Sequence, residues 1–550
     1  GFLFGADLGS MVICSDDTWK IRKNPAYVEA DEADFKANFR LPESNLYFDA
    51  AKDMGAWYAP DYDTDSWEQA DIVGAAGEGA WGKLRERMIP QWKDYGLKEY
   101  ENSAEWNGFT AKEDTVLSMC LPYNAQITPY LKIDAPAGKR IGIKADNYDD
   151  LLYDTKSVMA VYYAKDGFQE YESLGWMNGE KIFYSIPAGV TVHELKYRET
   201  GYDTEFAGEF VSDDEFLNKL WQKSIRTLYI TMRDTFMDCP DRERVQWWGD
   251  VNVEMQMMMY GLDEKAHLLY KKGVDSMAGW AEDTGSMFTV VPSGTELIEL
   301  PMQNLAGIWG FWHYYGCTGD RFVPERAYLM SRRYLLDYEM GSDGMVVHKK
   351  GSWDWPDWGS NSDIAPMENA WYYMALTACR NMAEFLGRTE DIPAFEKRLE
   401  SIWANYDCLF WKGEYYYGET ENGKPDDRAN ALAVLAGLAD EQYYPRIKEV
   451  LCSTENSSPY MEKYVLDALC EMGYIDDAVK RMKKRYREMV GYEYSTLWEY
   501  WNKDGTLNHA WSGGPLVTMS KYIAGVRPTD TAYRTFEIKP HMGDLKYVRC

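Results

Sequence analysis

The alternation of short and long connections between helices is the feature that most constrains the fold of this 550-residue chain. From Ser212 onward apolar residues recur with the period of a helix, and about twelve helical segments can be distinguished before Val526. They begin near residues 213, 250, 263, 301, 322, 366, 391, 427, 441, 458, 475 and 514. Links after even-numbered segments are short. Most links after odd-numbered segments are long and rich in Trp, Asp, Glu and Gly: 234–249, 281–300, 341–365, 411–426 and 491–512.

Six helical hairpins closed into a ring would place every long loop at the same end of the ring. The pattern therefore predicts an (α/α)6 toroid, with a functional site built from these loops at one mouth. A solenoid of stacked hairpins is the alternative. Its repeats would recur with self-similar sequence at roughly 34 to 47 residues. The helical half shows no such self-similarity, so we favour the toroid.

Up to about Phe210 the pattern is that of β-strands, because short runs of β-branched and aromatic residues alternate with turns that contain Gly or Pro. Residues 212–215 read as a capping box that opens the first helix. We expect a multidomain chain of four parts. These are an N-terminal β-sandwich module at 1–107, a second β-sandwich or linker module at 108–210, the toroid at 211–526, and at 527–550 the start of a C-terminal β-sandwich.

Composition narrows the class of ligand. The net charge of −30 repels phosphate backbones and anionic lipid surfaces, so nucleic acid and membrane partners are disfavoured. No apolar run approaches the roughly twenty residues that span a bilayer. The chain contains 22 Trp and 42 Tyr, an enrichment found both in large aromatic cores and where carbohydrate stacks on rings. A neutral carbohydrate is the partner that best suits these properties.

Cofactor and metal signals are weak. The nine cysteines are scattered without Cys-x-x-Cys spacing, so they predict neither a zinc site nor a disulfide framework. Cys239 is interpreted as a buried packing thiol. The chain lacks a phosphate-binding Gly-rich loop after a strand, a Gly-x-Ser-x-Gly elbow and a His-Glu-x-x-His motif. We therefore expect no cofactor and no metal.

The first long loop contains candidate chemistry. Residues 238–250 read Asp-Cys-Pro-Asp-Arg-Glu-Arg-Val-Gln-Trp-Trp-Gly-Asp. Glycoside hydrolysis needs two carboxyl groups across the scissile bond, and Glu243 is one candidate, with Asp238, Asp241 and Asp250 as competitors. The flanking arginines would lower the pKa of Glu243 while burial against indole would raise it. A salt-bridge lattice is the structural alternative, and for Asp250 it is a helix cap.

Two other long loops combine acids with indoles. In the last loop Glu499 lies between Trp498 and Trp501, and His509 follows ten residues later. In the third, residues 353–359 read Trp-Asp-Trp-Pro-Asp-Trp-Gly. Sugar stacking is the functional interpretation of these indoles, and a tryptophan-filled hub of the toroid is the alternative. Three such clusters in loops of the same parity favour one composite site.

These motifs resemble those of the bacterial α-L-rhamnosidases of glycoside hydrolase family 78. Asp238-Cys-Pro-x-Arg-Glu243-Arg-x-x-Trp247-x-Gly-Asp250 is similar to the acid-bearing loop of that family. Thr496-x-Trp-Glu499, followed by Asn508-His509, is similar to its base-bearing loop. A third family motif, Gly-Asp-Trp, is matched either by Asp357-Trp358 or by Asp354-Trp355.

The resemblance implies a catalytic (α/α)6 barrel and an inverting exo-glycosidase that removes terminal α-L-rhamnose. Glu243 would be the general acid and Glu499 the general base, with carboxyls roughly 6.5 to 9.5 Å apart. The residues that would bind the sugar are Asp238, Asp241, Arg242, Trp247, Asp250, Asp354, Trp355, Asp357, Trp358, Trp498 and His509. The motif alone leaves open which of Asp238 and Asp241 contacts the sugar.

Two further alternatives concern function. Trp248 and Tyr500 stand where many family members have smaller or basic residues, so a barrel that cleaves another glycoside is one of them. A carbohydrate-binding protein on a catalytically dead scaffold is the other. A role in glycan degradation implies a periplasmic or secreted location.

Overall fold

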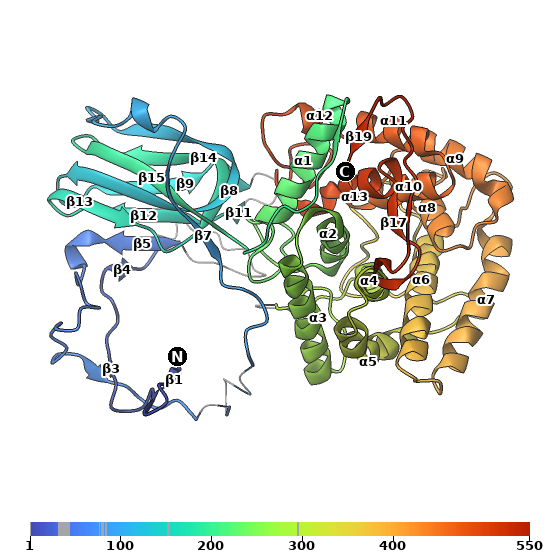
Figure 1. Cartoon of the computed structure of the whole chain (residues 1–550), viewed down its shortest axis with the longest axis horizontal. Coiled ribbons are helices and arrows are strands. Elements are labelled where there is room, and N and C mark those ends of the chain that lie inside the picture. The colour runs from blue at the N-terminus through green and yellow to red at the C-terminus, as the bar shows by residue number, and fades with distance from the viewer. Residues whose placement is uncertain are drawn as a thin grey trace.

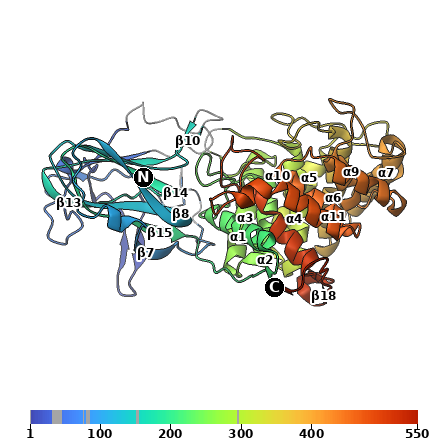
Figure 2. The ribbon, with the colours of Figure 1, turned by 90° about the horizontal axis from the view of Figure 1, so that it is seen from above.

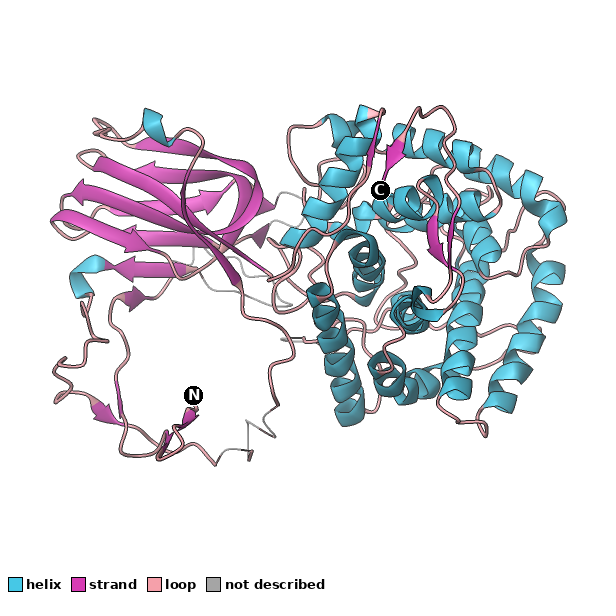
Figure 3. Cartoon of the chain, viewed as in Figure 1, coloured by secondary structure: helices cyan, strands magenta, loops and turns pink. Residues whose placement is uncertain are grey.

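The computed structural model describes residues 2–30, 45–75, 77–78, 82, 85–150, 155–293 and 296–550. The N-terminal part is built around a twisted sheet and the C-terminal part is helical, and the two lie side by side (Figure 1, Figure 3). Figure 2 shows the same arrangement from above, with the sheet beside the helices and not covering them. Within the described residues, no helix has both the length and the apolar character needed to span a membrane.

Nine strands form the large sheet, in the order β4-β5-β12-β9-β14-β8-β15-β7, with β13 paired to β8 outside this path. Their bounds are Tyr27–Val28 (β4), Leu46–Asp49 (β5), Lys93–Glu99 (β7), Thr115–Ala135 (β8), Arg140–Ala145 (β9), Met159–Tyr163 (β12), Gly167–Glu172 (β13), Met177–Ile186 (β14) and Thr191–Gly201 (β15). In the long strand β8, Leu117, Met119 and Ile133 are fully buried. Alternate residues of this strand supply the core of the sheet because side chains point to opposite faces with a period of two.

The expected boundary between residues 107 and 108 falls inside this sheet. Strand β5 pairs in parallel with β12, where Leu46 lies opposite Ala160. Strand β7 pairs antiparallel with β15, where Leu97 lies opposite Arg198. Residues on both sides of the expected boundary therefore build one sheet. The local sequence predicts where strands occur, but it does not predict which distant strand each one pairs with.

The helices are found where the periodicity predicts them. They are Glu215–Ile230 (α1), Trp248–Gly261 (α2), Lys265–Thr284 (α3), Pro301–Thr318 (α4), Phe322–Leu336 (α5), Ile364–Phe385 (α6), Ile392–Phe410 (α7), Asp427–Leu435 (α8), Tyr444–Ser453 (α9), Pro459–Glu471 (α10), Ile475–Arg485 (α11), Arg487–Gly491 (α12) and Pro515–Thr518 (α13). The extra short helix α12 follows α11 directly. Helix α13 continues as a π-helical turn over Met519–Ile523.

Helices α2, α4, α6, α8, α10 and α13 form a closed inner ring. Helices α2, α4, α6, α8 and α10 contact one another in that order, and α13 contacts both α10 and α2. Each odd-numbered helix from α1 to α11 packs against an even neighbour on the outside. The toroid prediction is thus confirmed over the solenoid, since a solenoid would leave its ends apart.

The first helix is capped two residues later than the motif suggests. The N-cap of α1 is Asp214, whose carboxylate accepts hydrogen bonds from the backbone N–H groups of Phe216 (3.0 Å) and Leu217 (3.3 Å). Ser212 instead exchanges hydrogen bonds with Asn218. A carboxylate near a helix N-terminus also complements the helix dipole, so Asp at the cap is favourable.

The sheet holds two of the long loops of the barrel. The side-chain amide of Asn147, which follows β9, donates to the carboxylate of Asp241 in the first loop (3.1 Å). The backbone N–H of Asn124 in β8 donates to Ser495 Oγ in the last loop (2.9 Å). Gln126 of β8 donates to the carbonyl of Ile230 at the end of α1 (2.7 Å). The β-part therefore positions the loops that contain the candidate acid and base.

Smaller pairs of strands complete the fold. At the C-terminus Val526–Pro528 (β17) pairs with Phe536–Ile538 (β18), and Val548–Arg549 (β19) pairs with Val211–Ser212 (β16), which precedes α1. The other pairs are Gly5–Asp7 (β1) with Val12–Cys14 (β2), Lys20–Ile21 (β3) with Glu68–Gln69 (β6), and Asp149–Asp150 (β10) with Thr155–Lys156 (β11). Where the start of a C-terminal β-sandwich was expected, after residue 526, the structure has these short β-strands.

Candidate active site

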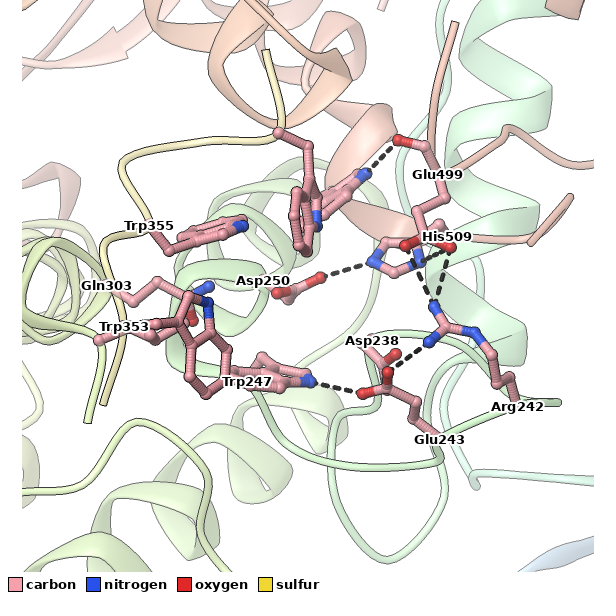
Figure 4. Close-up of a pocket in the computed structure, with 13 residues that line it drawn as sticks. Asp238, Arg242, Glu243, Trp247, Asp250, Gln303, Trp353, Trp355, Glu499 and His509 are labelled. Atoms are coloured by element: carbon pink, nitrogen blue, oxygen red, sulfur yellow. Dashed lines mark hydrogen bonds and ion pairs between the residues drawn. The ribbon is translucent and has the colours of Figure 1, made fainter. Parts of the chain in front are cut away.

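The long loops enclose a cavity of about 340 Å³ at one mouth of the barrel, here called the central cavity (Figure 4). The loops that contribute to it connect α1 to α2, α3 to α4, α5 to α6 and α12 to α13. The lining residues are Asp238, Arg242, Glu243, Trp247, Asp250, Leu300, Gln303, Trp353, Trp355, Trp358, Glu499, His509 and Trp511. Two carboxyl groups of the first loop, one in the first turn of α2 and one of the last loop therefore face a common space.

The first loop is closed by its own hydrogen bonds. The backbone N–H of Asp238 donates to the carbonyl of Val245 (2.9 Å), and the N–H of Val245 donates to Asp238 Oδ1 (3.1 Å). Arg244 adopts a left-handed conformation, with φ of 54°. Such a conformation is strained for a residue other than glycine. The Arg244 guanidinium compensates by donating to the carbonyls of Pro240 (2.8 Å) and Trp176 (3.2 Å). This turn directs Glu243 into the central cavity.

Arg242 joins the two candidate catalytic carboxylates. Its Nη1 donates to Glu243 Oε1, and its Nη2 donates to Glu499 Oε1 (3.1 Å) and Oε2 (3.0 Å). All three side chains are buried. The indole N–H of Trp247 donates to Glu243 Oε2 at 2.9 Å (Figure 4). Two acids that are 256 residues apart in the chain are thus brought to one guanidinium group.

Glu499 is surrounded by groups that favour its ionised form. Besides Arg242, the backbone N–H and the hydroxyl of Thr506 donate to Glu499 Oε2 (3.0 and 3.1 Å). Burial by itself would raise the pKa of Glu499, but the charges of Arg242 and His509 and the hydrogen bonds from Thr506 hold that pKa below its ordinary value. A buried carboxylate that stays ionised is suited to accept a proton from water.

The other acids of the central cavity respond to burial in the opposite way. Burial, reinforced by the nearby charge of Glu243, raises the pKa of Asp238 to about 8. Burial also raises the pKa of Asp250, although His509 opposes that shift. His509 Nε2 lies 2.9 Å from Asp250 Oδ1, and its Nδ1 lies 3.1 Å from Thr506 Oγ1. Burial would lower the pKa of His509, but Asp250 and Glu499 raise it above its ordinary value.

Indole rings form the apolar walls of the central cavity. Trp355 stacks on Trp511 with ring centroids 6.2 Å apart and an interplanar angle of 20°. Trp247 meets Trp353 edge to face, with centroids 6.3 Å apart. Leu300 adds an aliphatic surface. Rings around a carboxylate pair exclude water and offer faces against which the C–H groups of a sugar pack.

Four of the residues expected to bind the ligand do not line the central cavity. Asp241 is buried and accepts from Asn147 and from the backbone N–H of Arg242. The Oδ1 atom of Asp354 lies 2.7 Å from His348 Nε2. Asp357 forms a fully buried ion pair with Arg428, and Trp498 is fully buried against Tyr492. Their sequence neighbours Trp355, Trp358 and Glu499 face the cavity, because successive residues of a tight loop point in different directions. Of Asp238 and Asp241, it is Asp238 that lines the cavity.

Four lining residues were not on the expected list, namely Leu300, Gln303, Trp353 and Trp511. Trp353 and Trp511 belong to the tryptophan clusters that the sequence displays, so a signal existed for both. Gln303, in the first turn of α4, accepts a hydrogen bond from the backbone N–H of Gly249 (3.0 Å). A Cβ at Gly249 would lie 2.8 Å from that side chain. Nothing in the local sequence of Gln303 or Leu300 predicts this approach.

His348 bridges two carboxylates, those of Glu368 in α6 and Asp354 in the loop 353–359, and this arrangement is here called the clamp. Its Nδ1 lies 2.7 Å from Glu368 Oε2 and its Nε2 lies 2.7 Å from Asp354 Oδ1. The hydrogen bond to Glu368, with that to Asp354 adding to it, raises the pKa of His348 to about 9. The folded protein therefore retains a proton on His348 that the unfolded chain releases near pH 6.5.

This clamp predicts a pH-dependent stability difference between the wild-type protein and His348→Gln. The stabilisation is fully present below pH 6.5 and is lost as pH rises through about 9. Because His348 and Asp354 are partly exposed, we expect a loss of only about 1 kcal/mol at pH 6. Melting temperatures of both proteins from pH 6 to 10 test this. A difference that stays constant with pH would mean that His348 acts by packing alone.

One group of side chains in the described part of the chain has the proximity that metal binding needs. Ligand atoms of Asp238, Cys239 and His509 lie within 4.8 Å of one another. Cys239 Sγ already contacts Asp238 Oδ2 at 3.0 Å, and burial raises the pKa of this thiol well above its ordinary value. A protonated thiol is a poor metal ligand, so we assign no ion to this group.

Comparison with known proteins places the chain in a family. Residues 205–523 match the family model described as the bacterial α-L-rhamnosidase six-hairpin glycosidase domain. The fold and the site thus define a six-hairpin glycosidase domain, and the chain belongs to this α-L-rhamnosidase family. An α-L-rhamnosidase of Formosa agariphila is 24% identical over 593 residues, which cover 96% of this chain and 59% of that protein. One of Streptomyces avermitilis is 24% identical over 580 residues, covering 98% and 53%.

Solved structures agree with the fold. The α-L-rhamnosidase of Dictyoglumus thermophilum superposes with a TM-score of 0.81 at 21% identity, covering 98% of this chain and 62% of that one. The Streptomyces avermitilis enzyme in complex with L-rhamnose superposes with a TM-score of 0.77 at 18% identity, covering 98% and 53%. At these identities the likeness concerns the fold. The chain spans 53% to 61% of the length of three curated relatives that it matches.

Proposed function

We propose that this protein is an inverting exo-acting glycoside hydrolase that removes terminal α-L-rhamnose from glycans or glycosides. The observation that carries the proposal is the pairing of Glu243 and Glu499 on one buried guanidinium at the edge of an indole-walled cavity. Family membership supports the reaction class. The cavity volume of about 340 Å³ is at the small end of the range for ligand sites, which suits one terminal sugar.

Glu243 acts as the general acid in this proposal. It protonates the glycosidic oxygen as the bond between that oxygen and the anomeric carbon breaks. The indole N–H of Trp247 and the guanidinium of Arg242 hold its carboxyl group in place. The leaving group departs as a neutral alcohol, so no anion has to be released into a cavity that is already acidic.

Glu499 acts as the general base. It takes a proton from a water molecule whose oxygen forms the new bond to the anomeric carbon on the face opposite the leaving group. Its lowered pKa keeps it ionised for this step. The Arg242 guanidinium compensates the charge of Glu499, and His509, whose pKa is raised by Asp250 and Glu499, lies beside them. The product would be β-L-rhamnose.

Other polar groups of the central cavity would hold the sugar hydroxyls. Asp238, Asp250 and His509 line the cavity next to the catalytic pair. A protonated Asp238 can donate a hydrogen bond while Glu499 accepts, so the site offers both donors and acceptors. The stacked pair Trp355 and Trp511 offers an apolar wall for the C5 methyl group of a deoxysugar. A periplasmic or secreted location stays a prediction.

Proton NMR of the first-formed product tests the reaction. With a nitrophenyl α-L-rhamnoside we expect the β anomer to appear first and the α anomer to grow in by mutarotation. A panel of nitrophenyl glycosides of other sugars serves as the comparison, and turnover of another α-glycoside in preference to the rhamnoside would reassign the sugar. Initial release of the α anomer would mean retention and would make Glu499 a nucleophile. Binding of L-rhamnose without any turnover would indicate a dead scaffold.

A further inference from the structure

A second cavity adjoins the central one. It has a volume of about 770 Å³ and is here called the outer cavity. The residues that matter for its chemistry are Trp358, Tyr500, Trp501, Glu455, Glu488 and Asp504. Trp358 lines both cavities. Of the residues that line the outer cavity, only Trp358 belongs to one of the family motifs.

The outer cavity meets the central cavity at Trp358. Trp358 is 46% exposed, and its ring meets Trp355 of the central cavity with centroids 5.9 Å apart. On its other side Trp358 meets Tyr500, with centroids 6.3 Å apart. Tyr500 directly follows Glu499 in the chain. The part of a glycoside that extends past Trp358 from the central cavity therefore enters the outer cavity.

Buried contacts hold the walls of the outer cavity in place. Asp357, next to Trp358, pairs with Arg428 Nη1 (2.9 Å) and accepts from the backbone N–H of Ser458 (2.8 Å). A Cβ at Gly359 would lie 1.9 Å from the carbonyl oxygen of Asn456. The loop of Trp358 and the segment before α10 are thus in direct contact. A preformed wall lowers the entropic cost of binding.

The charge of the outer cavity is negative. Glu488 and Asp504 are exposed and form no ion pair within the described part of the chain. Glu455 is paired with Lys484 and Arg485, so it adds little net charge. Of the described residues that line the outer cavity, none is Lys or Arg. A carboxylate placed there would meet two exposed carboxylates that have no ion-pair partner among the described residues, whereas hydroxyl groups would find acceptors and aromatic faces.

We propose that the outer cavity is the leaving-group site and that it selects neutral sugars over uronic acids. This inference rests on the proposed function. Trp358 and Tyr500 stack on the sugar that is released, and Glu488 and Asp504 repel a leaving group that contains a carboxylate.

Two matched disaccharides test the proposal. Both carry α-L-rhamnose, one on glucose and the other, through the same linkage, on glucuronic acid. We expect kcat/KM to be higher for the neutral compound. Exposed charge pairs are worth about 0.2 to 1 kcal/mol each, which corresponds to a preference of about 2- to 30-fold for two charges. The preference should shrink as salt is raised, because the charges are exposed.

The double variant Glu488→Gln/Asp504→Asn identifies the source of the preference. We expect it to move the ratio of the two kcat/KM values toward one. Glu396→Gln, an exposed acid on the outer helix α7, is the matched control and should leave the ratio as in the wild type. A ratio that is the same in the double variant and the wild type would overturn the proposal.

Nitrophenyl α-L-rhamnoside separates the two levels of failure. If neither this compound nor the disaccharides are turned over, the proposed function fails. If they are turned over but the double variant leaves the ratio unchanged, only the assignment of the outer cavity fails.

Discussion

Glu243→Gln is expected to lower kcat/KM by about 10²- to 10⁴-fold for a rhamnoside whose leaving group is a sugar. A sugar alkoxide is a poor leaving group, so it needs the proton that the Gln amide cannot supply. A dinitrophenolate departs without protonation. With a dinitrophenyl rhamnoside the loss in this variant should therefore be much smaller.

Glu499→Gln should behave differently. Water must be deprotonated whatever the leaving group is, so we expect a loss of similar size, about 10²- to 10⁴-fold, with both substrates. Melting temperatures of the variants, with Glu396→Gln as the neutral control, show whether folding is preserved. The reverse pattern, with leaving-group dependence in Glu499→Gln, would exchange the two roles. Full activity of either variant would remove the residue concerned from the reaction.

Arg428→Met is expected to cause the largest loss of stability. Arg428, Asp357 and Asp426 have fully buried side chains, with Arg428 Nη1 2.9 Å from Asp357 and Nε 2.8 Å from Asp426. Removing the cation leaves two buried carboxylates without their partner. Breaking a buried pair in this way costs about 3 to 5 kcal/mol. The shift of the denaturant midpoint of the helical domain measures the change.

A matched exposed pair provides the control for Arg428→Met. Arg321 lies 3.0 Å from Glu325 on α5, and both side chains are at least half exposed. Arg321→Met should change stability by no more than about 0.5 kcal/mol. Since Asp357 anchors the loop of Trp358, Arg428→Met should also reduce kcat/KM at temperatures where the protein stays folded. Equal midpoint shifts in the two variants would contradict the role of the buried network.

Much of the barrel could be predicted because its signals are local. A helix shows its buried stripe through residues three and four apart, and the parity of short and long links places the loops at one mouth. The pairing order of the sheet is not local. Leu46 lies opposite Ala160, and the local sequence around either residue does not predict that the two strands pair. The expected boundary at residue 107 consequently falls inside a sheet that joins both sides.

The same distinction applies to the site. Charge and aromatic content identified the loops around Glu243 and Glu499, because acids among indoles are unusual both in cores and on surfaces. Which acid faces the cavity depends on backbone direction over one or two residues. Asp357 points to Arg428 while Trp358 points to the cavity, although the two are adjacent. Gln303 reaches the cavity because Gly249 admits it from another helix.

The sequence by itself determined the ring of helical hairpins, the parity of its loops and the chemical character of the candidate catalytic motifs, since these follow from short-range periodicity and composition. Only the tertiary structure decided that Arg242 joins Glu243 to Glu499, that Asp238 and not Asp241 lines the central cavity, and that an acidic outer cavity lies beyond Trp358. Each of these depends on distances between atoms far apart in the chain, and such distances are set by how the loops pack on the barrel and the sheet.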